Sequence, residues 1–323
     1  MLGDAEIVKA GPLSTVQDLG RLDHEAKGVR VCGVMDRLAA SIANRLVENP
    51  IDAPLVEQTL MGDQIRFNQP ARVAVCGGDA EVRLDGERRT TWQSFLVAGG
   101  SVLSVKGMAW GVRSYLAVQG GWHAEPVMGS ASTDLAAGLG GLNGRSLRAT
   151  DSLRFQPTES LSSTSDLRFS SARLTELYQR DRTTVGLRIL LGPDLDHFAT
   201  RFLNRLGYIE FKVGSDSNRQ GITLEIGSNE QELHSALGPD IVSSFTTMGS
   251  IQVPAHGRPT ILMADRQSTG GFARLGKVID ADLPALAQCR VGQTIVLLPV
   301  SIEEARAASR YLDTVCDYSR LES

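Results

Sequence analysis

Several residue types and patterns are scarce in this sequence, and each scarcity excludes a class of protein. The 323 residues include no block of basic residues, and the net charge is −4, which argues against nucleic acid or anionic membrane as a partner. No apolar run approaches the roughly 20 residues that cross a bilayer. The N-terminus carries Asp4 and Glu6 and lacks the apolar core of a secretory signal. We therefore expect a cytoplasmic protein.

Residues that bind metals or carry redox chemistry are also few. The sequence has five histidines without paired metal-ligand spacing, and none of its four cysteines forms a C-x-x-C pair. We expect no metal site, and we expect buried free thiols in a reducing compartment. None of the five lysines lies in an A-M-K-M sequence, so no biotin is expected on this chain. Neither a G-x-S-x-G elbow nor a complete G-x-G-x-x-G loop is present.

The length suggests roughly two domains, and 42% apolar residues are enough for real cores. Residues 1–155 contain short strand-like segments with turn signals about every ten residues, as in a barrel or sandwich. One helix is predicted over 38–46, which ends at Asn49-Pro50. Residues 156–183 include a serine-rich polar tract, which predicts an interdomain linker. The fold class is therefore mainly β with a few helices.

The second predicted domain spans 184–323 and is again rich in strands. It opens with an apolar strand over 185–191, and Asp194 then resembles the N-cap of a helix whose apolar face continues to Leu206. A C-terminal helix is predicted from Ser301, because Glu304 three residues later completes a capping-box pattern. The remaining strands are predicted over 209–213, 222–226, 250–253, 260–263 and 293–298.

The stretch from Ala264 to Gly271 carries the densest set of polar groups. The apolar run 259–263 predicts a buried strand that ends there, so a carboxylate, a guanidinium, an amide and two hydroxyls gather at one sheet end. A carboxylate and a guanidinium there suit a small polar or anionic ligand. The alternative is an ordinary strand-to-loop turn, in which Asp265 caps backbone amides and Arg266 lies in solvent.

Three other segments are candidates for a functional site, and each also has a purely structural or chance explanation. Gly77-Gly78-Asp79 follows a strand, and its carboxylate suits a ligand N–H, yet a hairpin turn explains it equally. Gln17, Asp18 and Arg21 form a polar cluster that is either a local ion pair or part of a site. Residues 271–277 match G-x-x-x-x-G-K, but Val278 replaces the hydroxyl residue of a phosphate loop, so coincidence is favoured.

Motifs in a fixed order along residues 7–298 resemble the biotin-dependent carboxyltransferase-like family. That family includes the C subunit of bacterial 5-oxoprolinase, also called allophanate hydrolase subunit 2, and part of the carboxyltransferase region of urea carboxylase. The matching segments are 11–21, Met35-Asp36, Asn49-Pro50, 57–60, 129–135, Gly140-Gly141, Gly144-Arg145, 251–254 and 264–271.

The resemblance implies a strand-rich N-terminal domain and a cyclophilin-like β-barrel in the C-terminal half. It implies that the chain is the C subunit of a complex with 5-oxoprolinase subunits B and A, which opens the 5-oxoproline lactam to glutamate with ATP. Which subunit binds ATP is left open, and the chain alone is expected to be inactive. Catalytic roles are expected for Asp265, Arg266, Gln267 and Thr269. Substrate contacts are expected from Gly270, Gly271, Gln17, Asp18, Arg21, Asp36, Gly78, Asp79 and Arg219.

The sequence departs from the family pattern at a few positions, which leaves other functions open. Asn218 replaces a usual carboxylate and Ala131 a usual arginine, while the remaining departures are Val34, Ala273 and Arg274. One alternative is a carboxyltransferase component that acts on urea or a related amide, with biotin on another chain. A second alternative is a regulatory module that antagonises a kinase-inhibiting sister protein.

Overall fold

The computed structural model of the chain describes residues 2–158, 166–226, 233, 237–238 and 240–315. These residues form two compact units: one comprises 2–22 and 32–174, and the other comprises 23–31 and 175–315. The boundary between the units falls within helix α2 (Ser171–Tyr178), inside the segment predicted as a linker. Part of that segment, 159–165, lies outside the described residues. Residues 23–31 group with the second unit although the sequence placed them in the first domain.

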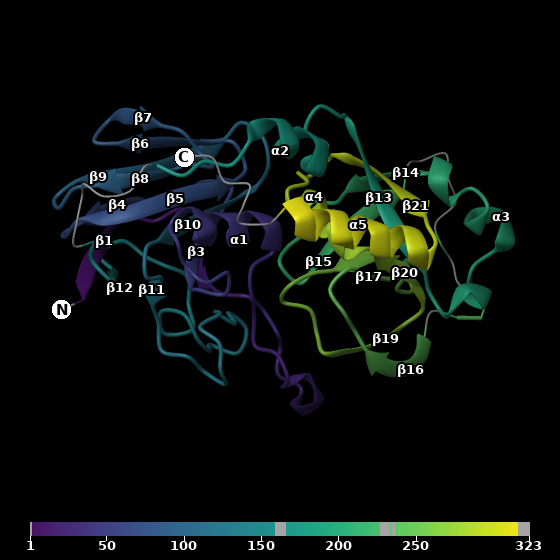
Figure 1. Cartoon of the computed structure of the whole chain (residues 1–323). Coiled ribbons are helices and arrows are strands. Elements are labelled where there is room, and N and C mark those ends of the chain that lie inside the picture. The colour runs from purple at the N-terminus through teal and green to yellow at the C-terminus, as the bar shows by residue number, and fades with distance from the viewer. Residues whose placement is uncertain (1, 159–165, 227–232, 234–236, 239, 316–323) are drawn as a thin grey trace. The chain divides into compact units, whose positions relative to one another are not determined.

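The first unit contains two antiparallel sheets (Figure 1). The seven-stranded sheet has the order β11-β12-β1-β4-β9-β6-β7 and consists of β1 (Gly3–Lys9), β4 (Gln64–Phe67), β6 (Ala80–Leu84), β7 (Glu87–Arg89), β9 (Val102–Met108), β11 (Trp122–His123) and β12 (Ser152–Phe155). The five-stranded sheet has the order β2-β3-β10-β5-β8 and consists of β2 (Leu13–Gln17), β3 (Leu55–Thr59), β5 (Ala71–Gly77), β8 (Ser94–Val97) and β10 (Arg113–Val118).

Local sequence signals explain the elements of this unit. Helix α1 (Arg37–Leu46) is confirmed: its apolar stripe is buried, it packs against β5 and β10, and Asp36 caps its first turn by accepting a bond from Ala39 N at 3.0 Å. The turn between β6 and β7 is Asp85-Gly86, a residue pair typical of tight hairpins, and both residues have positive φ, as such a turn requires. Packed rings at the centre of the core come from Phe67, Trp122 and Phe155.

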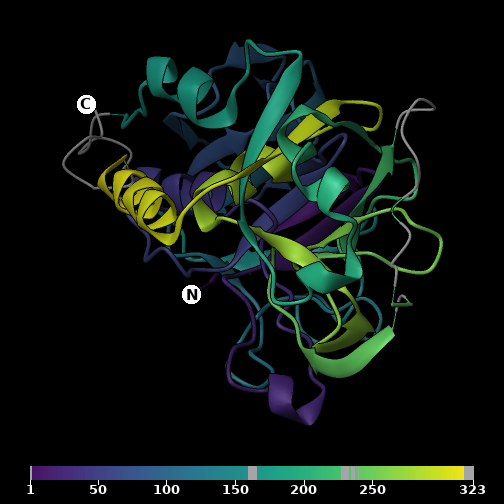
Figure 2. The ribbon, with the colours of Figure 1, turned by 90° about the vertical axis from the view of Figure 1, so that its right-hand side faces the viewer.

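The second unit contains a closed barrel with the order β13-β20-β17-β18-β15-β14-β21 (Figures 1 and 2). Its strands are β13 (Thr184–Leu191), β14 (Glu210–Val213), β15 (Gly221–Ile226), β17 (Ser250–Gln252), β18 (Thr260–Leu262), β20 (Arg274–Val278) and β21 (Thr294–Pro299). The parallel pair β13–β21 closes the ring. Alternate residues of β13, such as Val185, Leu187 and Ile189, are buried because a strand points successive side chains to opposite faces. The predicted mainly-β fold with a C-terminal barrel is confirmed.

Short elements surround the barrel strands. A separate pair of strands, β16 (Asp240–Phe245) and β19 (Thr269–Phe272), forms a two-stranded sheet. Helix α5 (Ile302–Val315) packs on β13, and its predicted capping box is present: Ser301 N donates to Glu304 Oε2 at 2.8 Å and Glu304 N donates to Ser301 Oγ at 3.2 Å. The remaining helical elements are η1 (Glu25–Lys27), η2 (Leu195–His197), α3 (Thr200–Leu203), η3 (Leu206–Tyr208), η4 (Asp280–Asp282) and α4 (Leu283–Ala287).

The single helix predicted after Asp194 is wrong. The chain forms the separate short elements η2, α3 and η3 there, and the Asp194 side chain makes no capping bond. Its carboxylate instead accepts bonds from Arg274 N at 3.0 Å and Arg274 Nε at 2.9 Å. Arg274, which is 80 residues away in the sequence, thus binds the carboxylate that the local pattern assigned to a helix cap.

Among the described residues, no helix is both long enough and apolar enough to cross a membrane.

Candidate functional site

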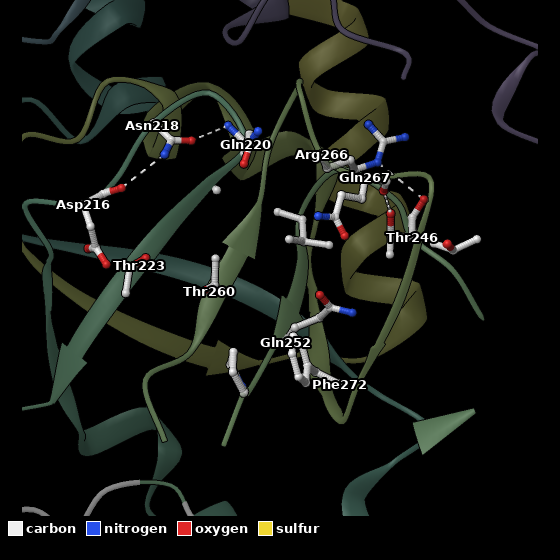
Figure 3. Close-up of a pocket in the computed structure, with 14 residues that line it drawn as sticks. Asp216, Asn218, Gln220, Thr223, Thr246, Gln252, Thr260, Arg266, Gln267 and Phe272 are labelled. Atoms are coloured by element: carbon white, nitrogen blue, oxygen red, sulfur yellow. Dashed lines mark hydrogen bonds between the residues drawn. The ribbon is translucent and has the colours of Figure 1, made fainter. Parts of the chain in front are cut away.

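A cavity of about 230 Å³ lies in the barrel unit (Figure 3). Strands β15, β17, β18 and β19 and the loops beside them provide its walls. The lining is Asp216, Asn218, Gln220, Gly221, Thr223, Thr246, Gln252, Pro254, Thr260, Leu262, Arg266, Gln267, Thr269 and Phe272. Ten of these 14 residues carry polar side chains, and eight of the ten are uncharged amides or hydroxyls. Such a lining suits a small molecule that is held by several hydrogen bonds and at most one or two charges.

The polar stretch after β18 contributes directly to this cavity. Arg266, Gln267 and Thr269, for which catalytic roles were expected, all line it. Arg266 is half-buried, and its Nε donates to Thr246 O at 3.4 Å. Its guanidinium is the one cationic group of the lining. Asp265 is not part of the lining, and the neighbouring glycines, Gly270 and Gly271, lie in β19.

Asp265 has a structural partner instead. Arg219 Nε donates to Asp265 Oδ2 at 2.9 Å and the Arg219 terminal nitrogen donates to Asp265 Oδ1 at 2.8 Å. Both side chains are buried, and Asp265 N also donates to Arg219 O at 2.9 Å. This fork joins the loop that precedes β15 to the loop that follows β18. Arg219 and Asp265 therefore hold the two loops from which Gln220 and Arg266 reach the cavity.

Thr246 secures the other side of the same loop. Its backbone N donates to Ser268 O at 3.0 Å, and its hydroxyl donates to the backbone oxygen of Gln267. Thr246 is buried and lines the cavity. The cavity-lining residues Arg266 and Gln267 are thus held from both flanks by contacts within the protein, and such pre-organisation lowers the entropic cost of binding in general.

Three departures from the family pattern take part in local contacts or packing of the barrel unit. Asn218 accepts a bond from Gln220 N at 2.7 Å and so shapes the turn before β15. Arg274 donates hydrogen bonds to the Asp194 carboxylate. Burial raises the pKa of this carboxyl group, but the side-chain and backbone bonds from Arg274 outweigh burial, so the pKa is lowered overall. Ala273 is fully buried beside them.

The polar cluster predicted around Gln17, Asp18 and Arg21 organises a loop of the first unit. Asp18 accepts bonds from Ser130 Oγ at 2.7 Å, Ala131 N at 2.6 Å and Ser132 Oγ at 2.5 Å. The predicted local pair between Asp18 and Arg21 does not form: Arg21 is fully buried and donates to the backbone oxygens of Val127, at 2.8 Å, and Ser132, at 2.8 Å. Its guanidinium bonds carbonyls because the 127–133 loop wraps around it.

The other predicted contacts of the first unit also have structural roles. The Gln17 Nε2 donates to Thr15 Oγ1 at 3.0 Å and Thr133 O at 3.2 Å. Asp36 caps α1. Gly78 N donates to Arg113 O at 2.7 Å and Asp79 N donates to Trp110 O at 2.8 Å, which makes this segment the connection between β5 and β6.

Sequence reasoning missed most of the inward-facing residues of the cavity. Thr223, Gln252 and Thr260 lie on the strand face opposite the buried isoleucines beside them in β15, β17 and β18, and a polar residue next to a buried isoleucine was the one signal that marked them. Thr246 had no such signal, because it follows β16 outside any apolar run.

The described residues also bear on a metal site and on a phosphate-binding loop. Within the described ranges no group of three or more His, Cys, Asp or Glu side chains is placed to hold a metal. The G-x-x-x-x-G-K segment forms β19 and β20 rather than a loop at a helix start, and Lys277 bonds Asp280 at 2.7 Å. These residues therefore do not fit a phosphate loop.

Comparison with known proteins gives consistent matches. The family described as carboxyltransferase domain, subdomain A and B, matches residues 27–299. The chain is 36% identical to the C subunit of 5-oxoprolinase from Escherichia coli, over 94% of this chain and 93% of that protein. It is 34% identical to the protein of the same name from Haemophilus influenzae, over 96% of this chain and 97% of that protein. The urea carboxylase of Kluyveromyces lactis superposes on 98% of the chain with a TM-score of 0.87 and 28% identity, and the match spans 29% of that longer protein.

Proposed function

Because the chain belongs to the carboxyltransferase family of subdomains A and B, we propose that it is the C subunit of an ATP-dependent 5-oxoprolinase. In this proposal it acts together with subunits A and B and opens the 5-oxoproline lactam to L-glutamate. The chain is inactive alone, and the barrel cavity bounded by Arg266, Gln267 and Thr269 is where the substrate binds.

One observation carries the proposal: the chain is similar over almost its whole length, and over almost the whole of theirs, to proteins named as the C subunit of 5-oxoprolinase. This broad similarity favours the same kind of subunit. The share of the Escherichia coli protein that is covered, 93%, contrasts with the 29% of the Kluyveromyces lactis urea carboxylase.

The cavity supports the proposal chemically. 5-Oxoproline is small and carries one carboxylate, one amide N–H and one amide carbonyl. Arg266 suits the carboxylate because a guanidinium binds it through charge-assisted hydrogen bonds. The amide of Gln267 and the hydroxyl of Thr269 suit the polar edge of the lactam, and they are able to donate to a carbonyl oxygen as negative charge develops on it.

ATP explains how so inert an amide is opened. A phosphoryl group transferred to the lactam oxygen makes that oxygen a leaving group. Water then adds to the carbonyl carbon, and the C–N bond breaks as the ring nitrogen takes up a proton, which leaves an acyl phosphate. A second water hydrolyses this acyl phosphate to glutamate and phosphate. In the proposal the residues of this chain hold the lactam in place and stabilise charge on its oxygen, and the nucleotide is handled within the assembled complex.

Reconstitution tests the proposal. The chain is co-purified with its sister subunits. ATP hydrolysis is measured with 5-oxoproline, 2-pyrrolidinone and urea, and glutamate formation is measured with 5-oxoproline. We expect glutamate formation that needs ATP, 5-oxoproline and all three subunits, with a complex lacking this chain as the control. Turnover of 5-oxoproline by the chain alone, or no turnover by the full complex, contradicts the proposal.

A second candidate is a carboxyltransferase component that acts on urea or a related amide. The superposition on Kluyveromyces lactis urea carboxylase favours it, and the eight uncharged amide and hydroxyl side chains of the lining also suit urea. In this case biotin is carried by another chain. Carboxylation of urea by this chain, supplied with a biotin carboxylase and a carboxybiotin carrier, would support the second candidate over the first.

A further inference from the structure

We propose that the side-chain amide of Gln252 is the specificity-determining group of the barrel cavity, and that it pairs with a ligand whose amide N–H and C=O lie on the same edge. This inference rests on the proposed function only in that it takes the cavity as the substrate site. Lactams, ureas and primary amides have such an edge. Open-chain secondary amides, which are trans, do not.

The first observation is an unused hydrogen-bond donor. Gln252 lies at the end of β17, lines the cavity and is only 7% exposed. Its Nε2 has no hydrogen-bond partner among the described residues. Buried donors are almost always bonded, since an unmade bond is unfavourable inside a protein. Figure 3 shows the amide ends of Gln252 and Gln267 directed toward the same space. A ligand in that space is the natural partner.

The second observation is the room that the chain keeps free around this amide. Gly270 lies beside it in β19, and a Cβ added to Gly270 would lie 2.3 Å from Nε2 and 3.1 Å from both Cδ and Oε1 of Gln252. Any other residue at this position would displace the Gln252 amide. The lack of a side chain at Gly270 therefore leaves room for the Gln252 amide in its observed position.

The chemistry of the carboxamide then selects the ligand. One edge of a carboxamide carries an N–H donor and a C=O acceptor, and a half-turn of the group reverses their order. A cis amide offers the matching acceptor and donor, so two parallel hydrogen bonds form. An amide whose nitrogen is methylated loses one of them. The backbone of Gln252 pairs with Thr260 and Arg274 in the barrel, which holds the amide at a fixed depth.

The test measures ligand affinity in the reconstituted complex without ATP, with 5-oxoproline, its N-methyl derivative and urea as probes. We expect Gln252→Leu, which is similar in size, to weaken 5-oxoproline and urea binding by about tenfold or more. The N-methyl derivative should bind the wild type weakly, and its affinity should change little in the variant. Gln252→Glu keeps an acceptor but no donor and should also lose affinity.

A second variant displaces the Gln252 amide without replacing Gln252 itself. Gly270→Ala should weaken binding as Gln252→Leu does, whereas Gly207→Ala should not, because a Cβ there meets only Leu298 Cδ2 at 3.9 Å. Melting temperatures confirm that all variants are folded.

The outcomes separate this inference from the proposed function. Unchanged affinities for 5-oxoproline and urea in Gln252→Leu overturn the inference, even where the wild-type complex turns over 5-oxoproline. No binding of either probe by the wild type also overturns it. A wild-type complex without 5-oxoproline turnover overturns the proposed function, while a selective loss of urea binding in Gln252→Leu would still support the inference.

Discussion

Arg219 and Asp265 form a buried, two-point ion pair although 46 residues separate them in the sequence. The pair joins the loop before β15 to the loop after β18, and both loops border the barrel cavity. The carboxylate that looked most like a catalytic group is thus occupied by a protein partner. The structure assigns it to holding the cavity wall.

Replacing Asp265 should therefore reduce stability before it changes chemistry. We expect Asp265→Ala to lower the free energy of unfolding by about 3 to 5 kcal/mol, because it removes the buried two-point bond that the Arg219 guanidinium makes to Asp265. Denaturant unfolding measures this loss. The double variant Arg219→Met/Asp265→Leu should recover part of it, since both charged members of the pair are replaced by apolar side chains. Wild-type stability in Asp265→Ala, with activity lost, would instead point to a direct chemical role.

Asp18 should be equally structural in the first unit. Its carboxylate accepts bonds from the 130–132 segment and from Gly20 N at 2.8 Å. We expect Asp18→Ala to cost at least about 2 kcal/mol of unfolding free energy, because several donors lose their acceptor together. Thermal melts and proteolysis near residue 130 would measure the effect, with the exposed Asp52→Ala as the control. An unchanged melt would show that solvent replaces the carboxylate at no cost.

The pair of Arg145 and Asp151 predicts a pH dependence of stability. Arg145 donates to both carboxylate oxygens of Asp151, at 2.7 and 2.8 Å, and these bonds lower the pKa of Asp151. A lowered carboxyl pKa stabilises the fold above the unfolded-state pKa of about 3.9, and this contribution is lost as pH falls through the folded-state pKa.

Asp151→Asn should thus destabilise the protein by about 1 to 3 kcal/mol at pH 7. It should also flatten the loss of stability below about pH 5. Unfolding free energies between pH 7 and pH 3 measure both effects, and the exposed Asp52→Asn serves as the control. An acid limb as steep as that of the wild type would exclude Asp151 as a source of the pH dependence.

Local patterns predicted the elements that depend on local physics. Helix α1 and the capping box of α5 follow from caps and an apolar stripe close together in the chain. Six of the seven barrel strands follow from alternation or from short apolar runs, whereas β20 lies in a segment that was not predicted as a strand. The helix after Asp194 failed because Arg274, from a distant strand, takes the group that the cap required.

The candidate site was only partly predictable for the same reason. The polar stretch after β18 signalled Arg266, Gln267 and Thr269, and these residues do line the cavity. The separation of Asp265 from them depends on Arg219, and no local pattern shows such a distant pairing. The role inferred for Gln252 depends on where β17 and β19 lie in space, which is a property of the fold rather than of any motif.

The central claim is that the barrel cavity is the substrate site of a 5-oxoprolinase complex, and Arg266 tests it most directly. The measurement is kcat/KM for ATP-dependent opening of 5-oxoproline by the reconstituted complex with Arg266→Ala. Loss of a charge-assisted clamp on the substrate carboxylate predicts about a 100-fold reduction, with assembly and melting temperature close to those of the wild type. A kcat/KM near the wild-type value in a correctly assembled complex would contradict the claim.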